Sequence, residues 1–175
     1  MVLLPHAVVG AAIGVAVKNP LWSFLIGIVS HHLMDSFPHL DYGSRLIKKS
    51  GPRFLGHKPK IKSDSPRKFD ETFWKILFVD FSVAWTIFLW IFYRLPEDLW
   101  LSVFFGALGA LFPDVLSFYP PFVKAVTRKY KWAARIAEIH SVFHWALPVK
   151  PLFWGLFWQI AFTASALVYL SRFLQ

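Results

Sequence analysis

The chain has 175 residues, of which 56% are hydrophobic and 19% aromatic, well above the roughly 45–50% apolar share of soluble domains. It carries no cysteine, which excludes disulfides and thiolate metal sites, so metal ligands must come from histidine, aspartate, glutamate or water. The net charge of +9 in so apolar a chain favours a basic surface against anionic lipid over nucleic-acid binding, since no nucleic-acid-binding module is recognisable. We therefore predict a single membrane-embedded domain over residues 1–175, an all-α bundle of about five hydrophobic helices plus a cytoplasmic amphipathic helix.

Two short apolar helices are predicted first, over Leu3–Val17 and Leu21–Asp35, with a turn between them. The first contains four small residues, Gly10, Ala11, Ala12 and Gly14, which allow close contact with a neighbouring helix in a membrane. Both segments are shorter than the about 20 residues that a bilayer span needs. We expect either a thin hairpin or spans completed by polar residues that reach the interface.

The end of the second helix and the turn after it, Ser30–Asp41, hold three of the seven histidines and two of the ten acidic residues. Two of these histidines lie three and four residues before Asp35, so in a helix imidazole and carboxylate share a face. Pro38 interrupts the helix and places the last two polar residues in the following turn. Imidazole and carboxylate suit zinc, manganese or iron, and a solvated polar helix end is the alternative interpretation. The candidate ligands in this stretch are His31, His32, Asp35, His39 and Asp41.

The rest of the chain alternates basic and apolar segments. Residues 42–68 contain nine Lys or Arg, one Asp, three Pro and three Gly, a composition that predicts a loop and not a span. Phe73–Tyr93 and Leu99–Tyr119 are long enough to cross a membrane and return. Phe122–Leu147 mixes basic and aromatic residues, which predicts an amphipathic helix on an anionic membrane surface. Leu152–Leu174 is predicted as a final, lipid-facing span.

The distribution of basic residues predicts the topology. If the third and fourth helices form a hairpin, the basic loops 42–68 and 122–150 lie on the same side, which the positive-inside rule assigns to the cytoplasm. The C-terminus then lies on the opposite side. Nearly all candidate ligands reach the cytoplasmic face of what we expect to be a prokaryotic inner membrane. This face adds His6, Asp80, Asp114, His140 and His144 to the candidate metal ligands.

Two acidic residues are candidates for a catalytic role. Asp80 is a carboxylate within a predicted span, which costs roughly 2.5 kcal/mol or more unless it is paired or bound to a cation. We expect it to bind metal and take part in catalysis, with a buried pair to a lysine as the alternative. Glu138 precedes His140 and His144, whose i, i+4 spacing is that of zinc sites, although it also occurs on polar helix faces. Glu138 is therefore a candidate general base, or else a partner of Arg135 or Lys131.

Four short segments carry a resemblance that spans most of the chain. They are PHAVVGAAIG at the N-terminus, SHHLMDSFPH, GALFPDV within residues 106–115, and IHSVFH. Together they resemble the membrane-bound metal-dependent hydrolase family, which is related in motif to zinc-dependent phospholipase C. The matching residues are His6, His32 with Asp35, Pro113 with Asp114, and His140 with His144.

The resemblance implies hydrolysis of an ester or phosphodiester by one to three divalent ions, Zn²⁺ or alternatively Mn²⁺ or Fe²⁺. We expect a phospholipid or another lipid-linked phosphate ester as substrate, with anionic headgroups held by the basic loops. The alternatives are a non-enzymatic metal-binding membrane protein and a metal-ion transporter. A transport path predicts polar residues reaching both faces, whereas here Asp80 is the one deep carboxylate, which favours an enzyme.

Overall fold

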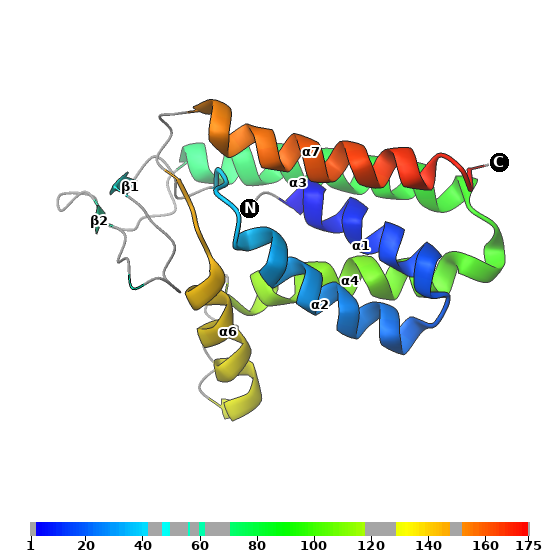
Figure 1. Cartoon of the computed structure of the whole chain (residues 1–175), viewed down its shortest axis with the longest axis horizontal. Helices are drawn as coiled ribbons and strands as arrows, with labels where there is room; N and C mark the ends of the chain where they lie inside the picture. The colour runs from blue at the N-terminus through cyan, green and yellow to red at the C-terminus, as the bar shows by residue number, and fades with distance from the viewer. Residues whose placement is uncertain are drawn as a thin grey trace.

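The computed structural model describes residues 3–41, 47–49, 56, 60–61, 71–117, 129–147 and 152–174. Helices form most of this part of the chain, and one short strand pair lies in the first basic loop (Figure 1). In order, the elements are α1 (Leu3–Val17), α2 (Pro20–Asp35), β1 (Ile47–Lys49), β2 (Lys60–Ile61), α3 (Glu71–Arg94), the 3-10 helix η3 (Glu97–Leu99), α4 (Trp100–Ser117), α6 (Lys131–Phe143) and α7 (Leu152–Leu170).

The long axis of the molecule is followed by α1, α2, α3, α4 and α7, and α6 runs across one end (Figure 1). α4 packs against α1 and α2, while α1 also contacts α3 and α7. Among the described residues, three helical segments are long and apolar enough to cross a membrane: Trp74–Arg94, Glu97–Leu116 and Phe153–Leu170. These helices indicate a membrane protein. The predicted helical bundle is confirmed, whereas α1, with 15 residues, is a shorter apolar helix.

Glycines bring α1, α2 and α4 into close contact. A Cβ atom at Gly10 would lie 2.5 Å from the carbonyl oxygen of Gly106, and one at Gly27 would lie 2.6 Å from the same oxygen. Both distances are far shorter than a carbon atom tolerates, so the two backbones can approach α4 only because a side chain is missing. The predicted close packing of the first helix is confirmed, and its partner is α4.

The turn between α1 and α2 is set by local sequence. Lys18 adopts a left-handed backbone with φ 54°, which ends α1. Asn19 then caps α2, because its side-chain oxygen accepts a hydrogen bond from the Trp22 N–H at 3.1 Å. Pro20 occupies the first turn, where its missing N–H is tolerated. The turn therefore sends α2 back along α1, so that the start of α1 and the end of α2 meet.

The interior and the outer surface of the bundle are both apolar. Val8, Val15, Ile91 and Val103 are among the buried side chains that join α1, α3, α4 and α7. Large apolar residues on α2, α3, α4 and α7 face outward, with Phe78 exposing 71% of its surface. In water such a surface would be unfavourable, whereas a lipid environment accommodates it.

Two segments differ from the prediction. In the basic loop, β1 pairs with β2 in antiparallel fashion, with Ile47 opposite Ile61, a pairing that the sequence analysis did not predict. α6 begins at Lys131 and ends at Phe143, and is shorter than the helix predicted over Phe122–Leu147. Most of the loop 42–68, including His57, and residues 122–128 and 148–150 lie outside the described residues.

Candidate metal centre

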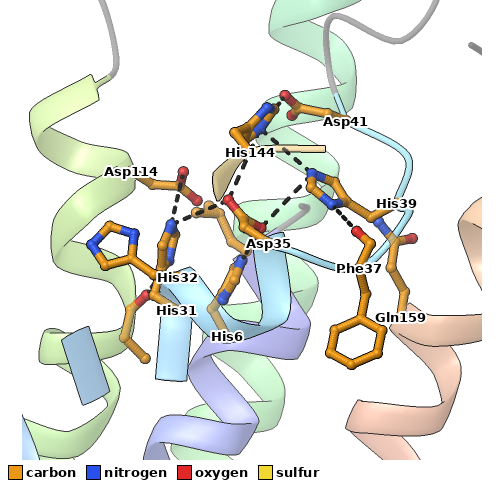
Figure 2. A network of polar contacts seen from close by, with 12 residues as sticks. His6, His31, His32, Asp35, Phe37, His39, Asp41, Asp114, His144 and Gln159 are labelled. Atoms are coloured by element: carbon orange, nitrogen blue, oxygen red, sulfur yellow. Dashed lines mark hydrogen bonds and ion pairs between the residues drawn. The ribbon is translucent and has the colours of Figure 1, made fainter. Parts of the chain in front are cut away.

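Six histidines and three aspartates converge where α1 begins, α2 and α4 end, and α6 crosses the bundle (Figure 2). The predicted convergence of ligand-type residues at one end of the molecule is thus confirmed. The members are His6 from α1, His31, His32 and Asp35 from α2, His39 and Asp41 from the turn after it, Asp114 from α4, His140 from α6, and His144 directly after α6. We call this set the His/Asp cluster.

Asp35 lies at the centre of the cluster and is fully buried. Five imidazoles surround its carboxylate, each with a ring nitrogen within 4.0 Å of one of its oxygens. The distances are 3.3 Å to His6 Nε2, 3.4 Å to His31 Nε2, 3.7 Å to His140 Nδ1, 3.8 Å to His39 Nε2 and 4.0 Å to His144 Nε2. The five rings come from α1, from α2, from the turn after it, and from α6 and its C-terminal end, so only the folded bundle can assemble them.

Backbone carbonyls fix the orientation of two of these rings. His31 Nδ1 lies 2.7 Å from the Ala110 carbonyl oxygen, and His39 Nδ1 lies 2.9 Å from that of Phe37. A carbonyl oxygen can only accept, so the Nδ1 atoms carry the protons and donate. In the neutral rings, the Nε2 lone pairs of His31 and His39 therefore point into the cluster. Metal-binding histidines are held in this way by their second ring nitrogen.

These lone pairs meet other acceptors at short range. His31 Nε2 lies 3.0 Å from His140 Nδ1, 3.4 Å from Asp35 Oδ2 and 3.6 Å from Asp114 Oδ1. A proton on His140 Nδ1 satisfies the first contact, but then His140 Nε2 is an acceptor that lies 3.7 Å from the Asp114 carboxylate. Acceptors at such distances repel one another unless a proton or a metal cation lies between them.

The ligand-type atoms form two main groups that share Asp35. His31, Asp35, Asp114 and His140 make one group, and Asp35, His39 and His144 make the other; within each, one ligand atom per residue lies within 4.8 Å of the rest. A third group consists of His31, His32 and His140. Zinc bonds of about 2.0–2.1 Å place tetrahedral ligand atoms about 3.3 Å apart, close to the measured separations. The cluster can therefore hold a metal ion.

Charge and hydrogen bonding also favour a cation. Three carboxylates meet in the cluster, and Nδ1 of His6 and of His32 is buried with no hydrogen-bond partner among the described residues. Burial, helped by the nearby His144, lowers the pKa of His140 from 6.5 to about 2. Burial also holds the pKa of His39 well below its usual range. Both imidazoles are thus neutral near pH 7, the state in which they bind metals.

One edge of the cluster is open to the surroundings. The side chains of Asp114, His144 and Asp41 expose 18%, 22% and 23% of their surface, whereas those of Asp35 and His31 expose none. His144 Nε2 lies 3.1 Å from Asp41 Oδ2 and 3.5 Å from His39 Nε2, so the Asp41 carboxylate and the His39 ring meet the same nitrogen at this edge.

Backbone pairing positions the second group. The His39 N–H donates to the Trp145 carbonyl at 3.2 Å, and the Leu147 N–H donates to the His39 carbonyl at 2.7 Å. The Trp145 N–H also donates to the Asp35 carbonyl at 2.9 Å, which satisfies one orphan carbonyl at the end of α2. This short parallel bridge fixes the turn after α2 against the segment after α6, and so brings His39 beside His144.

Gln159 of α7 is a contributor that the sequence analysis missed. Its buried side-chain amide donates to the Leu40 carbonyl at 2.6 Å, between His39 and Asp41 (Figure 2). One turn earlier, Gly155 makes room for the Leu40 side chain, which lies 2.5 Å from where a Cβ would be. α7 therefore supports the cluster besides facing lipid. The sequence did contain a signal for this role, since a single amide side chain in an apolar helix is expected to have a hydrogen-bond partner.

Two predicted site residues have other partners. Asp80 Oδ2 accepts a hydrogen bond from the Leu3 N–H at 2.7 Å, which is one of the unpaired donors at the start of α1. A hydrogen bond from a backbone N–H can thus offset the cost of placing this carboxylate in an apolar helix, a partner that the prediction did not consider. Glu138 is 63% exposed and accepts from Arg135 at 2.8 Å, the alternative that the sequence left open. Neither residue belongs to the groups above, which cover only the described part of the chain.

The roles of the two adjacent histidines also differ from the expectation. The resemblance pairs His32 with Asp35, whereas in the structure His31 makes the contact with Asp35 and with Asp114. His32 is half-buried and stands against the rings of His140 and Phe143, with centroids 6.0 Å away in both cases. On a helix the i, i+4 pair shares a face more closely than the i, i+3 pair, which favours His31.

Comparisons with known proteins leave the family open. No family model matches the chain, and searches of curated proteins and of solved structures found no similar protein.

Proposed function

We propose that this protein is a membrane-embedded metal-dependent hydrolase that cleaves a phospholipid or another lipid-linked phosphodiester. The observation that carries the proposal is a buried carboxylate, Asp35, surrounded by five imidazoles, two of which, those of His31 and His39, are oriented by backbone carbonyls so that their Nε2 atoms face it. The resemblance to membrane-bound metal-dependent hydrolases, related in motif to phospholipase C, agrees with this chemistry.

Two divalent ions, Zn²⁺ in preference to Mn²⁺ or Fe²⁺, account for the arrangement of the cluster. His31, Asp35, Asp114 and His140 would hold the first, and Asp35, His39 and His144 the second. Asp35 would then serve in both groups, since it belongs to each of them. Such ions supply a nucleophile from water at neutral pH and polarise the phosphoryl oxygen. The open edge beside Asp41 and Asp114 would admit the phosphate ester.

We further propose that all five apolar helices lie in the membrane, with the His/Asp cluster at the cytoplasmic face of a prokaryotic inner membrane. α1 and α2 have 15 and 16 residues, so each is about 22–24 Å long at about 1.5 Å per residue. This length falls short of a bilayer core of about 30 Å, which places their polar ends near the headgroups. Lys and Arg of the two basic loops would hold anionic lipids there.

Ion transport has less support than hydrolysis. A transport path needs polar groups across the membrane. Beyond the cluster, the described interior between α1, α3, α4 and α7 is built from aliphatic and aromatic side chains such as Val15, Ile91 and Val103. Among the described residues, the buried imidazoles and carboxylates gather at one end, as expected of a site that works at one surface.

Purified protein in mixed micelles with a panel of phospholipids provides the test. Asp35→Ala should lose bound metal and phospholipid hydrolysis together, because it removes the residue common to both main groups. Asp98→Ala, on an exposed carboxylate of η3, is the matched control and should retain both. Wild-type protein that binds no transition metal, or hydrolysis that persists with a chelator and in Asp35→Ala, would reject the proposal.

A further inference from the structure

We propose that α6 lies immersed in the interfacial layer of an anionic membrane and so holds the His/Asp cluster at the depth of the lipid headgroups. The position of α6 in the membrane can be tested without measuring enzymatic activity. The consequence for the substrate, a lipid in the bilayer and not a soluble ester, rests on the proposed function.

The first observation is an apolar stripe along α6. Trp132, Ile136, Ile139 and Phe143 follow one another at intervals of four, three and four residues, so they lie on one face of the helix. Three of them are exposed, by 53% for Trp132, 38% for Ile139 and 37% for Phe143. The bundle is contacted by another face, that of the buried Ala133 and His140. Each of these three side chains therefore leaves more than a third of its surface exposed.

The second observation is where the stripe meets the bundle. The Trp132 ring stacks on Phe112 of α4, a helix that includes a candidate membrane span, with centroids 6.3 Å apart and planes 8° apart. At the other end, Phe143 contacts His32 of α2. On α2, the outward-facing Val29 and Leu33 expose 65% and 62%. The stripe is thus continuous with the apolar surface of α2 and α4, which identifies bilayer lipid as its occupant.

The third observation is the charge beside the stripe. Lys131, Arg135 and Glu138 share a separate, solvent-facing side of α6, and Lys129 precedes them over the Tyr130 ring. Basic residues outnumber acidic ones here, as in helices that bind anionic membranes. α6 also runs across the bundle axis (Figure 1), the direction of a helix that lies in the membrane plane beside spanning helices.

The consequence for the site follows from His140. This ligand lies on α6 between the stripe and the bundle, and Phe143 of the stripe stands against His32 of the cluster. If α6 is buried in the interfacial layer of the membrane, it would therefore hold the His/Asp cluster at the depth of the lipid phosphate groups. Lipids beside α6 would reach the open edge without leaving the bilayer.

The depth test uses the absence of cysteine in this chain. Single cysteines at Ile139 and at Glu138 carry a nitroxide label in the full protein, reconstituted into vesicles of phosphatidylcholine with phosphatidylglycerol. Relaxation by oxygen should dominate for Ile139→Cys and relaxation by a water-soluble nickel chelate for Glu138→Cys. Phe78→Cys on α3 serves as the lipid-facing reference. Equal, water-like accessibility at Ile139 and Glu138 would overturn the proposal.

The substrate arm compares two phosphodiesters. Ile139→Asp should reduce hydrolysis of vesicle phospholipid at least tenfold while leaving metal content and hydrolysis of a water-soluble phosphodiester unchanged. Ala134→Asp, on an exposed position away from the stripe, is the control. An equal loss on both substrates would refute lipid delivery by α6. A wild-type protein without hydrolase activity would reject the proposed function, while the depth test would still decide the position of α6.

Discussion

Asp35 shows how one residue organises the cluster. A carboxylate without water is costly, and the nearest neighbours of Asp35 are imidazoles from three helices and the adjoining segments. Asp35 is also the residue common to both main groups of candidate ligands. Removing it should therefore have a larger effect on metal content than removing any single histidine.

Asp80 permits a test between a metal ligand and a helix-capping residue. Asp80→Asn keeps an oxygen that can accept from the Leu3 N–H, whereas Asp80→Ala removes it. We expect both variants to retain bound metal, and Asp80→Ala to lower the free energy of unfolding by about 1 kcal/mol. Metal analysis and thermal unfolding in detergent measure the two effects. Loss of bound metal in Asp80→Asn would show that Asp80 is a metal ligand.

The buried imidazoles predict the pH dependence of the metal-free protein. Because the pKa of His140 falls from 6.5 to about 2, and that of His39 is also lowered, the unfolded chain binds more protons than the folded one below pH 6.5. The free energy of unfolding should therefore decrease as the pH falls from 6.5, by up to about 1.4 kcal/mol per pH unit for each histidine. Above pH 7 neither group contributes a slope.

Thermal unfolding of chelator-treated protein between pH 8 and pH 4.5 measures this dependence. His140→Phe should show a smaller slope than the wild type. A metal-free protein that becomes more stable on acidification would contradict the neutral state of these imidazoles.

At the scale of elements, α7 acts on the cluster through one amide. Gln159→Leu removes the donor to Leu40, which lies between His39 and Asp41. With two ions bound as proposed, the variant should lose the ion held by Asp35, His39 and His144 and keep the other, so that the metal content falls from two ions toward one. Thr163→Val is the matched control, since this hydroxyl bonds the carbonyl of Gln159 within the same helix. An unchanged metal content in Gln159→Leu would contradict the positioning role.

The glycine contacts of α4 predict a second effect at this scale. A methyl group at Gly106 would overlap the Gly10 carbonyl oxygen, and one at Gly109 would overlap that of Phe24. Gly106→Ala should lower the free energy of unfolding by about 1–3 kcal/mol, because packed backbones must separate. Metal content should fall as well, since α2 and α4 both carry ligands. Ala164→Val, exposed on α7, should leave both unchanged.

For the whole molecule, the direction of the helices predicts opposite sides for α6 and the C-terminus (Figure 1). Single cysteines replacing Lys131 and Arg172, both exposed, test this in a chain without other cysteines. In intact cells an impermeant maleimide should label Arg172→Cys, and should label Lys131→Cys only after permeabilisation. Labelling of both from the same side would contradict the topology and the cytoplasmic location of the cluster.

Much of this architecture was predictable from local pattern. The bounds of the first helix agree with the prediction, and those of the other apolar helices agree within a few residues, because long apolar runs and proline breaks are local signals. Histidine and aspartate at helix ends also indicated which residues would meet. The strand pair β1–β2 escaped prediction, because two and three residues carry too little pattern.

The partners of individual polar groups were less predictable. Asp80 and Glu138 were both predicted to take part in catalysis. In the structure Asp80 accepts a hydrogen bond from the Leu3 N–H at the start of α1, and Glu138 pairs with Arg135 on the exposed side of α6. Gln159 attracted no attention, although it holds the turn that carries two site residues. The partners of Asp80 and Gln159 lie on other elements, and the side of α6 that carries Glu138 is turned away from the cluster, so spacing along the chain alone does not reveal either arrangement.

The sequence by itself determined the apolar helices, the absence of thiolate ligands and the set of imidazoles and carboxylates available at one end of the bundle, because composition and periodicity are properties of the chain. Only the tertiary structure decided that Asp35 stands at the centre, that His31 and not His32 contacts it, and that carbonyls of Ala110 and Phe37 orient the rings. The reason is that these contacts depend on how closely α1, α2 and α4 approach and where α6 crosses them, and glycine packing between helices sets that approach.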